Sequence, residues 1–127
     1  METNPVAGIM SPAAARTIFT FKVPVAMQER LKTPIATMGL VKLTVDEEIT
    51  AAKLAHGEGA SNAFALLKQS LVAVNGKKVT LADGTAEGAL NAMDPAVRAL
   101  CIKAYESIHS PKEDEAADFL GSVSASL

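Results

Sequence analysis

Aromatic residues and cysteine are scarce in this sequence, and each scarcity excludes a class of protein. The 127 residues include no tryptophan, one tyrosine and four phenylalanines, so a core must be built mainly from aliphatic side chains. Such a core buries modest area per residue, and we expect assembly with partners to add stability. The single cysteine, Cys101, excludes an intrachain disulfide and any zinc site made of several cysteines.

Long apolar runs and a strong positive charge are also missing. No apolar run approaches the roughly 18 residues of a membrane-spanning helix. Residues 1–10 have Glu2 where a secretory signal would carry positive charge. The net charge of −2 argues against a nucleic-acid-binding surface. We therefore expect a cytoplasmic protein that binds neither membranes nor nucleic acid.

The charge that is present is unevenly distributed along the chain. Residues 1–43 contain five Lys or Arg against two Asp or Glu, whereas residues 44–127 contain seven against twelve. The most acidic stretch is 106–118. Such a separation can orient docking between chains, although a solvated acidic helix is its more common meaning.

The N-terminal third is predicted to be extended. Residues 1–15 are small and Pro-containing, which predicts an arm without regular structure. Alternating β-branched and aromatic residues over 16–25 predict a strand that ends near Pro24. We expect a polar connector over 27–32 and a second strand over 35–43, paired antiparallel with the first. Two strands alone are marginal in water, so this ribbon needs a helix or a partner to cover it.

The residue pattern becomes helical at Thr44. Thr44 and Glu47 match a capping box, which predicts a helix that runs to about His56 and ends at Gly57. One face of this helix comprises Val45, Ile49, Ala52 and His56. A second helix is predicted over 60–74, so the two should form a helical hairpin. Its apolar stripe comprises Ala60, Phe64, Leu67, Leu71 and Val74.

Turn signals dominate the next segment. Asn75-Gly76 between apolar residues predicts a β-hairpin, and its short arms indicate a small excursion rather than a sheet. Asp83-Gly84 marks another turn, and a short helix over 85–93 is predicted to follow.

Two later helices begin at clear capping signals. Asp94 as N-cap and Pro95 at the first helical position predict a helix over 95–109. Its expected buried face comprises Val97, Leu100, Cys101, Ala104, Tyr105 and Ile108. Ser110 and Glu113 repeat the device as a capping box that opens the last helix. Its apolar positions, near the predicted end at 123, are Ala116, Phe119, Leu120 and Val123.

These elements predict an α+β fold that is mainly α. An extended arm (1–15) would precede a single domain over 16–123, a length within the usual range for one domain. In that domain a β-ribbon (16–43) is followed by a helical body (44–123) of four to five short helices with a small β-hairpin excursion. Residues 124–127 would form a frayed tail.

The residues suited to chemistry each have a local structural explanation. His56 and His109 lie at predicted helix C-termini, where imidazole interacts with the last carbonyls, and no further ligand stands at metal-binding spacing. Cys101 lies on an apolar stripe, which predicts a buried, inert thiol. The acidic clusters at 46–48 and 113–118 occupy first turns of helices, where carboxylates stabilise the helix dipole.

Two further patterns are weaker candidates. The Gly57-Glu58-Gly59 segment resembles a phosphate-binding loop but lacks the Lys-Ser/Thr of a P-loop, so a tight interhelical turn explains it better. Lys77-Lys78 lies at a hairpin tip without an aromatic stacking platform. We therefore predict no catalytic residue, no cofactor site and no metal site, and a protein that is not an enzyme.

Several segments read together resemble a known group of proteins. They are 43–48 (LTVDEE), 70–84 (SLVAVNGKKVTLADG), 93–100 (MDPAVRAL), 104–105 (AY), 109–113 (HSPKE) and 118–120 (DFL). The chain resembles small proteins encoded in tail modules of tailed bacteriophages, of the tail-assembly-chaperone or baseplate-component kind. In those proteins a short β segment precedes a helical body with a V-[ND]-G-K turn. The resemblance covers about residues 40–122, and its motifs are turns and caps.

The resemblance implies a non-catalytic protein that binds other tail proteins, such as the tube, the baseplate or the tape measure, with a second copy as a further candidate. In one version it is a structural part of the virion tail, where the arm and the 16–43 ribbon add strands to neighbours. In the other it is an assembly chaperone that works in the host cytoplasm and leaves the particle. A small helical regulatory or adaptor module is the remaining alternative.

Overall fold

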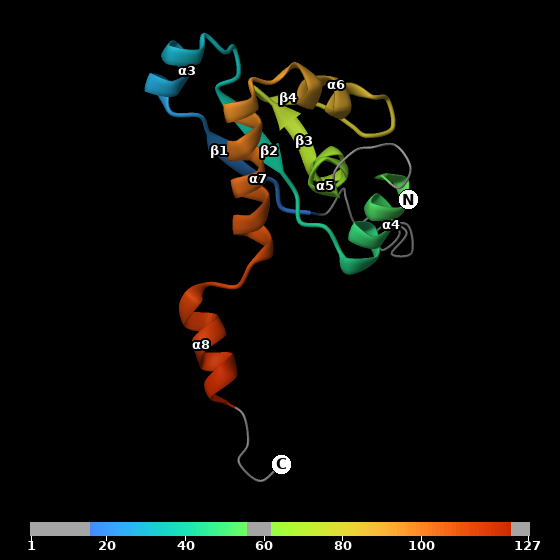
Figure 1. Cartoon of the computed structure of the whole chain (residues 1–127), viewed down its shortest axis with the longest axis vertical. Coiled ribbons are helices and arrows are strands. Elements are labelled where there is room, and N and C mark those ends of the chain that lie inside the picture. Colours follow the sequence, from blue (N-terminus) through green and yellow to red (C-terminus); the bar gives the residue numbers. More distant parts are fainter. Residues whose placement is uncertain (1–15, 56–61, 123–127) are drawn as a thin grey trace, which may run out of the picture.

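A computed structural model describes residues 16–55 and 62–122. The fold is mainly helical with a small antiparallel sheet, which confirms the predicted α+β class (Figure 1). The elements in chain order are β1 (Phe19–Lys22), α3 (Val25–Leu31), β2 (Thr37–Leu40), α4 (Val45–Ala55), α5 (Asn62–Ser70), β3 (Leu71–Val74), β4 (Lys77–Lys78), α6 (Thr85–Ala92), α7 (Pro95–His109) and α8 (Glu113–Gly121). The predictions for the arm at 1–15, His56, the turn at 57–59, Val123 and the tail at 124–127 lie outside the described residues.

The sheet has four strands in the order β1-β2-β3-β4. The predicted ribbon is confirmed, because β1 and β2 pair antiparallel, with Phe19 opposite Leu40 and Lys22 opposite Thr37. Both strands are shorter than predicted. The ribbon is not left to a partner, since β3 pairs with the free side of β2 and helix α7 lies across one face of the sheet (Figure 1).

The polar connector predicted over 27–32 is wrong, because α3 occupies this segment. Pro24 precedes the first turn, where its missing N–H costs nothing, and its carbonyl accepts from the Gln28 amide at 3.0 Å. The Gln28 side chain donates to the carbonyl of Val23 at 2.8 Å. Lys32 then ends the helix in the left-handed conformation, with φ of 54°. Good helix formers between these two signals explain the helix.

The helix predicted over 60–74 is wrong in its last four residues. Helix α5 ends at Ser70 and strand β3 begins at Leu71, so Leu71 and Val74 lie in the sheet. Ser70 is fully buried, and its hydroxyl donates to the carbonyl of Val41 at 2.7 Å while the Val41 amide donates back to Ser70 at 2.9 Å. These contacts, 29 residues apart, outweigh the helical spacing of the local apolar residues.

The predicted turn at Asn75-Gly76 is confirmed, but the hairpin is no isolated excursion because β3 is an inner strand. Both residues have positive φ, 53° and 78°. The Asn75 side chain accepts from the Ala36 amide at 2.7 Å and donates to the Pro34 carbonyl at 2.9 Å, which fastens the turn to the start of β2. Glycine at 39 in β2 leaves room for its neighbours, since a Cβ there would lie 2.9 Å from the Ile18 side chain and 3.2 Å from that of Ala73.

Helix α7 has the predicted bounds and supplies much of the core. The Asp94 carboxylate accepts from the Ala96 amide at 2.8 Å, as expected of the N-cap. All of its predicted face is buried except Leu100, which is half-buried. The completely enclosed apolar side chains that it meets or contributes include Met38, Leu40, Leu67, Leu71, Leu90, Val97 and Cys101. The short helix predicted over 85–93 is confirmed as α6.

The hairpin of α4 and α5 is confirmed, although the apolar face predicted for α4 does not enter the core. The Thr44–Glu47 capping box is present, with the Glu47 carboxylate 2.8 Å from the Thr44 amide. Val45 and Ile49, however, are exposed, and Ala51 is the residue that packs, against Ala65 of α5. The helices approach through small residues, so the larger side chains of α4 stay outside.

Candidate functional site

His109 is the predicted candidate residue with the most contacts, and all of them are structural. Its Nδ1 lies 2.7 Å from the Tyr105 carbonyl, and its Nε2 accepts from the Leu43 amide at 2.8 Å. These partners assign the neutral tautomer with hydrogen on Nδ1. The ring also stacks on Tyr105 at 3.9 Å. The expected interaction with a last-turn carbonyl is therefore present, and the link to Leu43 is additional.

Tyr105 extends this contact to α4. Its hydroxyl donates to the Glu48 carboxylate. Burial, followed by the hydrogen bond and the negative charge of Glu48, raises the pKa of the phenol well above its usual range. We name the set Glu48, Tyr105, His109 and the Leu43 amide the latch, because it joins the end of α7 to the start of α4. The ring nitrogens of His109 and the hydroxyl of Tyr105 all have partners within the fold.

Cys101 and the Lys77-Lys78 pair are not members of the latch. Cys101 is completely buried, and burial raises the pKa of its thiol to about 12, which makes it unreactive. Within residues 16–55 and 62–122, no group of three or more His, Cys, Asp or Glu side chains is placed to hold a metal ion. Lys77 and Lys78 are exposed on β4. No helix in this part of the chain is long and apolar enough to cross a membrane.

The acidic residues at 46–48 divide between a cap and the latch. Burial raises the pKa of Glu47, but hydrogen bonds from Arg16 and Thr44 and the charge of Arg16 outweigh burial and lower it. Arg16 Nη2 lies 2.5 Å from Glu47 Oε2, and Nη1 donates to the Lys42 carbonyl at 3.0 Å. These contacts fix the entry to α4, as expected for first-turn acids.

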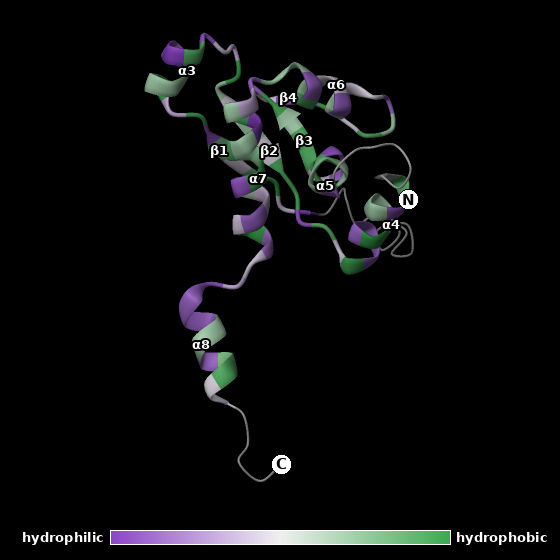
Figure 2. Cartoon of the chain, viewed as in Figure 1, coloured by the Kyte–Doolittle hydropathy of each residue, from purple (hydrophilic) through white to green (hydrophobic). Residues whose placement is uncertain are grey.

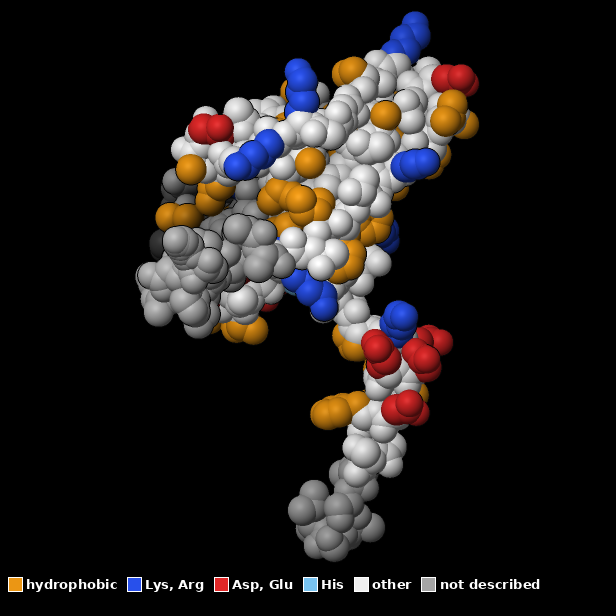
Figure 3. Space-filling model, turned by 180° about the vertical axis from the view of Figure 1, so that it is seen from behind, with side chains coloured by type: hydrophobic (Ala, Val, Ile, Leu, Met, Phe, Trp, Pro, Cys, Tyr) orange, Lys and Arg blue, Asp and Glu red, His pale blue; other side chains and the backbone are white. Residues whose placement is uncertain are grey.

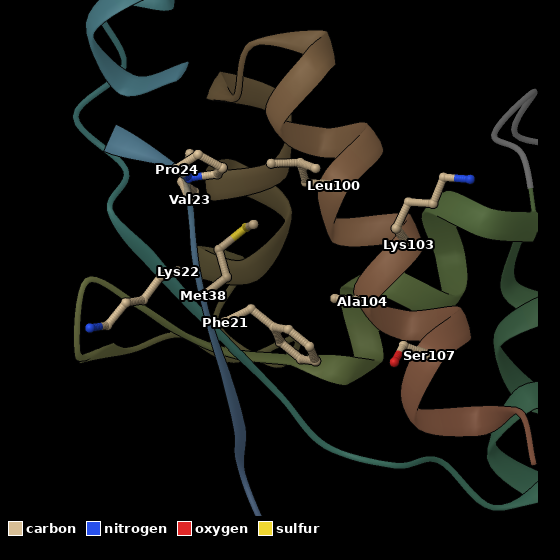
Figure 4. Close-up of a pocket in the computed structure, with 9 residues that line it drawn as sticks. All are labelled: Phe21, Lys22, Val23, Pro24, Met38, Leu100, Lys103, Ala104 and Ser107. Atoms are coloured by element: carbon tan, nitrogen blue, oxygen red, sulfur yellow. The ribbon is translucent and has the colours of Figure 1, made fainter. Parts of the chain in front are cut away.

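An apolar groove, which the sequence did not predict, lies between β1 and α7. Its volume is about 340 Å³. Phe21 and Met38 point toward α7 from the sheet, and Leu100 points back from the helix (Figure 4). Val23, Pro24 and Ala104 complete the apolar wall, and Lys22, Lys103 and Ser107 lie at its edges. We call this site the β1–α7 groove. Nothing local in the sequence signals that these two segments meet.

Helix α8, like the β1–α7 groove, is not covered by the rest of the described residues. It continues beyond the end of α7, away from the sheet (Figure 1), and none of its residues is buried. Phe119 is 76% exposed and Leu120 is 68% exposed. Acidic side chains gather on the same projecting helix (Figure 3), and Figure 2 shows its hydrophilic first turn followed by apolar positions.

The predicted start of α8, with Ser110 as N-cap, is wrong by two residues. Ser110 is extended, with ψ of 143°, because it precedes Pro111. The helix begins instead at Glu113, and the Glu115 carboxylate accepts from the Lys112 amide at 2.8 Å. The residues between α7 and α8 therefore form an extended connection, which accounts for the separation of α8 from the body.

Comparisons of the whole chain with known protein families, with curated proteins and with solved structures found no match.

Proposed function

We propose that this chain is a non-catalytic phage tail protein that acts by contacts with other proteins, as a structural component of the tail or baseplate. The observation that carries the proposal is the position of α8. A helix that buries none of its residues and exposes Phe119 and Leu120 has no function in its own core. An exposed aromatic and leucine pair on a helix is typical of an element that docks on another chain.

The polar residues support the same interpretation. Asp94 caps α7, Asn75 closes the hairpin, and His109 and Tyr105 fasten α7 to α4. The hollow found on the described surface is walled by apolar side chains and contains no acid or histidine. Such a site suits an apolar segment of another protein better than the polar, concave arrangement of catalysis.

The phage assignment comes from the sequence resemblance, whose motifs lie at described turns and caps. The Val74-Asn75-Gly76-Lys77 turn fastens β3 to β2, and the Asp94-Pro95 pair opens the main core helix. Both positions shape the fold rather than contact a ligand. The resemblance therefore supports a shared architecture, and with it a shared role in tail assembly.

The test is the protein content of purified particles made from the genome that encodes the chain. Quantitative mass spectrometry should find the chain at a fixed ratio to the tail tube protein. Replacing both Phe119 and Leu120 with serine should remove it from particles, while the matched pair Val45→Ser and Ile49→Ser should remain. Absence of the unaltered chain from mature particles would rule out the structural role.

An assembly chaperone is the second candidate, and the β1–α7 groove favours it. An open apolar groove can hold an apolar segment of a tail protein before that segment reaches its final place. The chain would then co-purify with tape measure or baseplate intermediates and be missing from finished particles. The same mass spectrometry experiment separates the two roles.

A further inference from the structure

Among residues 16–55 and 62–122, two features of opposite shape have no partner, the β1–α7 groove and the projecting α8. The groove is concave, and its wall is formed by Phe21, Val23, Pro24, Met38, Leu100 and Ala104. Helix α8 is convex and presents Phe119 and Leu120 to solvent. Moving apolar side chains of this size out of water lowers the free energy, so each feature is a suitable partner for the other.

Charge adds to this complementarity of shape. Lys103 lies at the α7 edge of the groove and its amino group points outward, whereas the Lys22 side chain extends from the other side of β1, opposite to Phe21 (Figure 4). The groove lining contains no acidic residue. Helix α8 carries four acidic residues and no basic one, namely Glu113, Asp114, Glu115 and Asp118. An acidic helix with an apolar anchor therefore matches an apolar groove that has a lysine at its edge and no acidic residue.

The connection between α7 and α8 keeps the helix away from the groove of its own copy. Pro111 disfavours the helical conformation at Ser110, and both Ser110 and Lys112 are extended, with ψ of 143° and 155°. Helix α8 therefore runs on past the end of α7 instead of turning back along it (Figure 1).

We propose that α8 of one copy docks in the β1–α7 groove of a second copy. Phe119 is the apolar anchor, Leu120 packs beside it, and the acidic residues lie near Lys103. Because each copy has one helix and one groove, a two-fold axis satisfies both at once and closes the assembly as a dimer. The inference rests on the proposed protein-contact function only in that α8 is the contacting element.

The first experiment measures the mass of the full-length protein by light scattering and sedimentation over a wide concentration range. The unaltered chain should form a dimer. Phe119→Ser with Leu120→Ser should weaken it about 100-fold or more, since two large apolar side chains no longer leave water. The matched exposed pair on α4, Val45→Ser with Ile49→Ser, should dimerise normally. At concentrations where every chain is monomeric, both variants should melt like the unaltered chain.

The second experiment tests the groove by exchanging charges. Lys103→Glu should weaken the dimer, and so should Glu115→Lys with Asp118→Lys, because each places like charges together at both contacts. An equimolar mixture of the two variants should restore a mixed dimer, in which both helices meet a groove of opposite charge. High salt should weaken the unaltered dimer and the mixed dimer alike. Failure of the mixture to associate would overturn the charge pairing and the docking site.

Other occupants of the groove give other results. A chain that stays monomeric and loses thermal stability on Phe119→Ser has α8 folded onto its own groove, and this overturns the proposal. A monomer that is indifferent to Phe119→Ser also overturns it, and leaves the groove to a foreign segment. If the chain is present in particles but monomeric in solution, the inference fails and the proposed function stands. If the chain dimerises but is absent from particles, the inference stands and the proposed structural role fails.

Discussion

Helices α7 and α8 follow each other along the chain and have similar apolar residues, but α7 is buried on one face and α8 is not. A proline stands at the first position of α7 and two residues before α8, and both helices carry apolar residues at helical spacing. In α7 these residues are enclosed by the sheet, and Val97 and Cys101 are completely buried. In α8 Phe119 is 76% exposed. The difference shows that an apolar stripe identifies a helix but does not identify what covers it.

The largest expected effect comes from placing a charge in each helix. Val97→Asp buries an unpaired carboxylate in the core and should lower the free energy of unfolding by about 3–5 kcal/mol. Leu120→Asp in α8 should change it by less than about 0.5 kcal/mol. Urea unfolding followed by circular dichroism measures both. Similar losses for the two variants would show that α8 belongs to the folded body.

The latch lies at the C-terminal end of α7, where the buried face of this helix ends. His109→Ala leaves the Leu43 amide without its acceptor and removes the stacking on Tyr105. The free energy of unfolding should fall by about 1–3 kcal/mol. Tyr105→Phe, which removes only the hydroxyl bond to Glu48, should cost less, about 1 kcal/mol. Because the latch joins α7 to α4, neither variant should unfold α8. Unfolding of α8 in either variant would contradict the separation of the two helices.

A smaller effect is expected from pH at the α4 entry. The lowered pKa of Glu47 means that its carboxylate stabilises the fold above the ordinary value of 4.5, and that this contribution is lost as pH falls through the lowered pKa. Glu47→Gln should lower the free energy of unfolding by about 1 kcal/mol near neutral pH, through the loss of the negative charge that pairs with Arg16, while the Gln amide oxygen can still accept from the Thr44 amide. The difference from the unaltered chain should disappear in acid. A difference in the free energy of unfolding that grows as the pH falls would contradict a lowered pKa of Glu47.

The smallest effect on the fold is expected from a thiol placed in each helix. Cys101 should resist a thiol reagent in the native protein and react only on unfolding, because it is buried and its thiol has a pKa of about 12. Phe119→Cys should add one thiol that reacts at once in a monomer. Protection of this new thiol at high protein concentration would locate α8 in the dimer contact.

The sequence predicts those elements whose ends are set by local chemistry. The bounds of α7 follow from Asp94 and Pro95, and the turn at 75–76 follows from residues that tolerate positive φ. The boundary between α5 and β3 was missed, since Ser70 is fixed by Val41 from a distant strand. The sequence does not predict helix α3, because proline at 24 suits the end of a strand as well as the start of a helix.

The candidate site is less predictable than the fold. The structural roles of His109 and Cys101 follow from their places at a helix end and on an apolar stripe. The His109 contact with Leu43 spans 66 residues, and the groove joins Phe21 to Leu100, so no local pattern contains either. The exposure of Phe119 could not be predicted, because the same spacing describes a covered helix equally well.

The two outer strands of the sheet differ in their capacity to accept another strand. Strand β4 is two residues long, and both residues are exposed lysines. Charged lysines on an edge strand disfavour pairing with another strand, including β4 of a second copy. Strand β1 is twice as long and alternates half-buried and exposed residues. Any neighbour that lengthens the sheet by backbone pairing would therefore do so beside Phe19–Lys22. The sheet can grow in one direction only, which protects the isolated chain from fibre-like stacking.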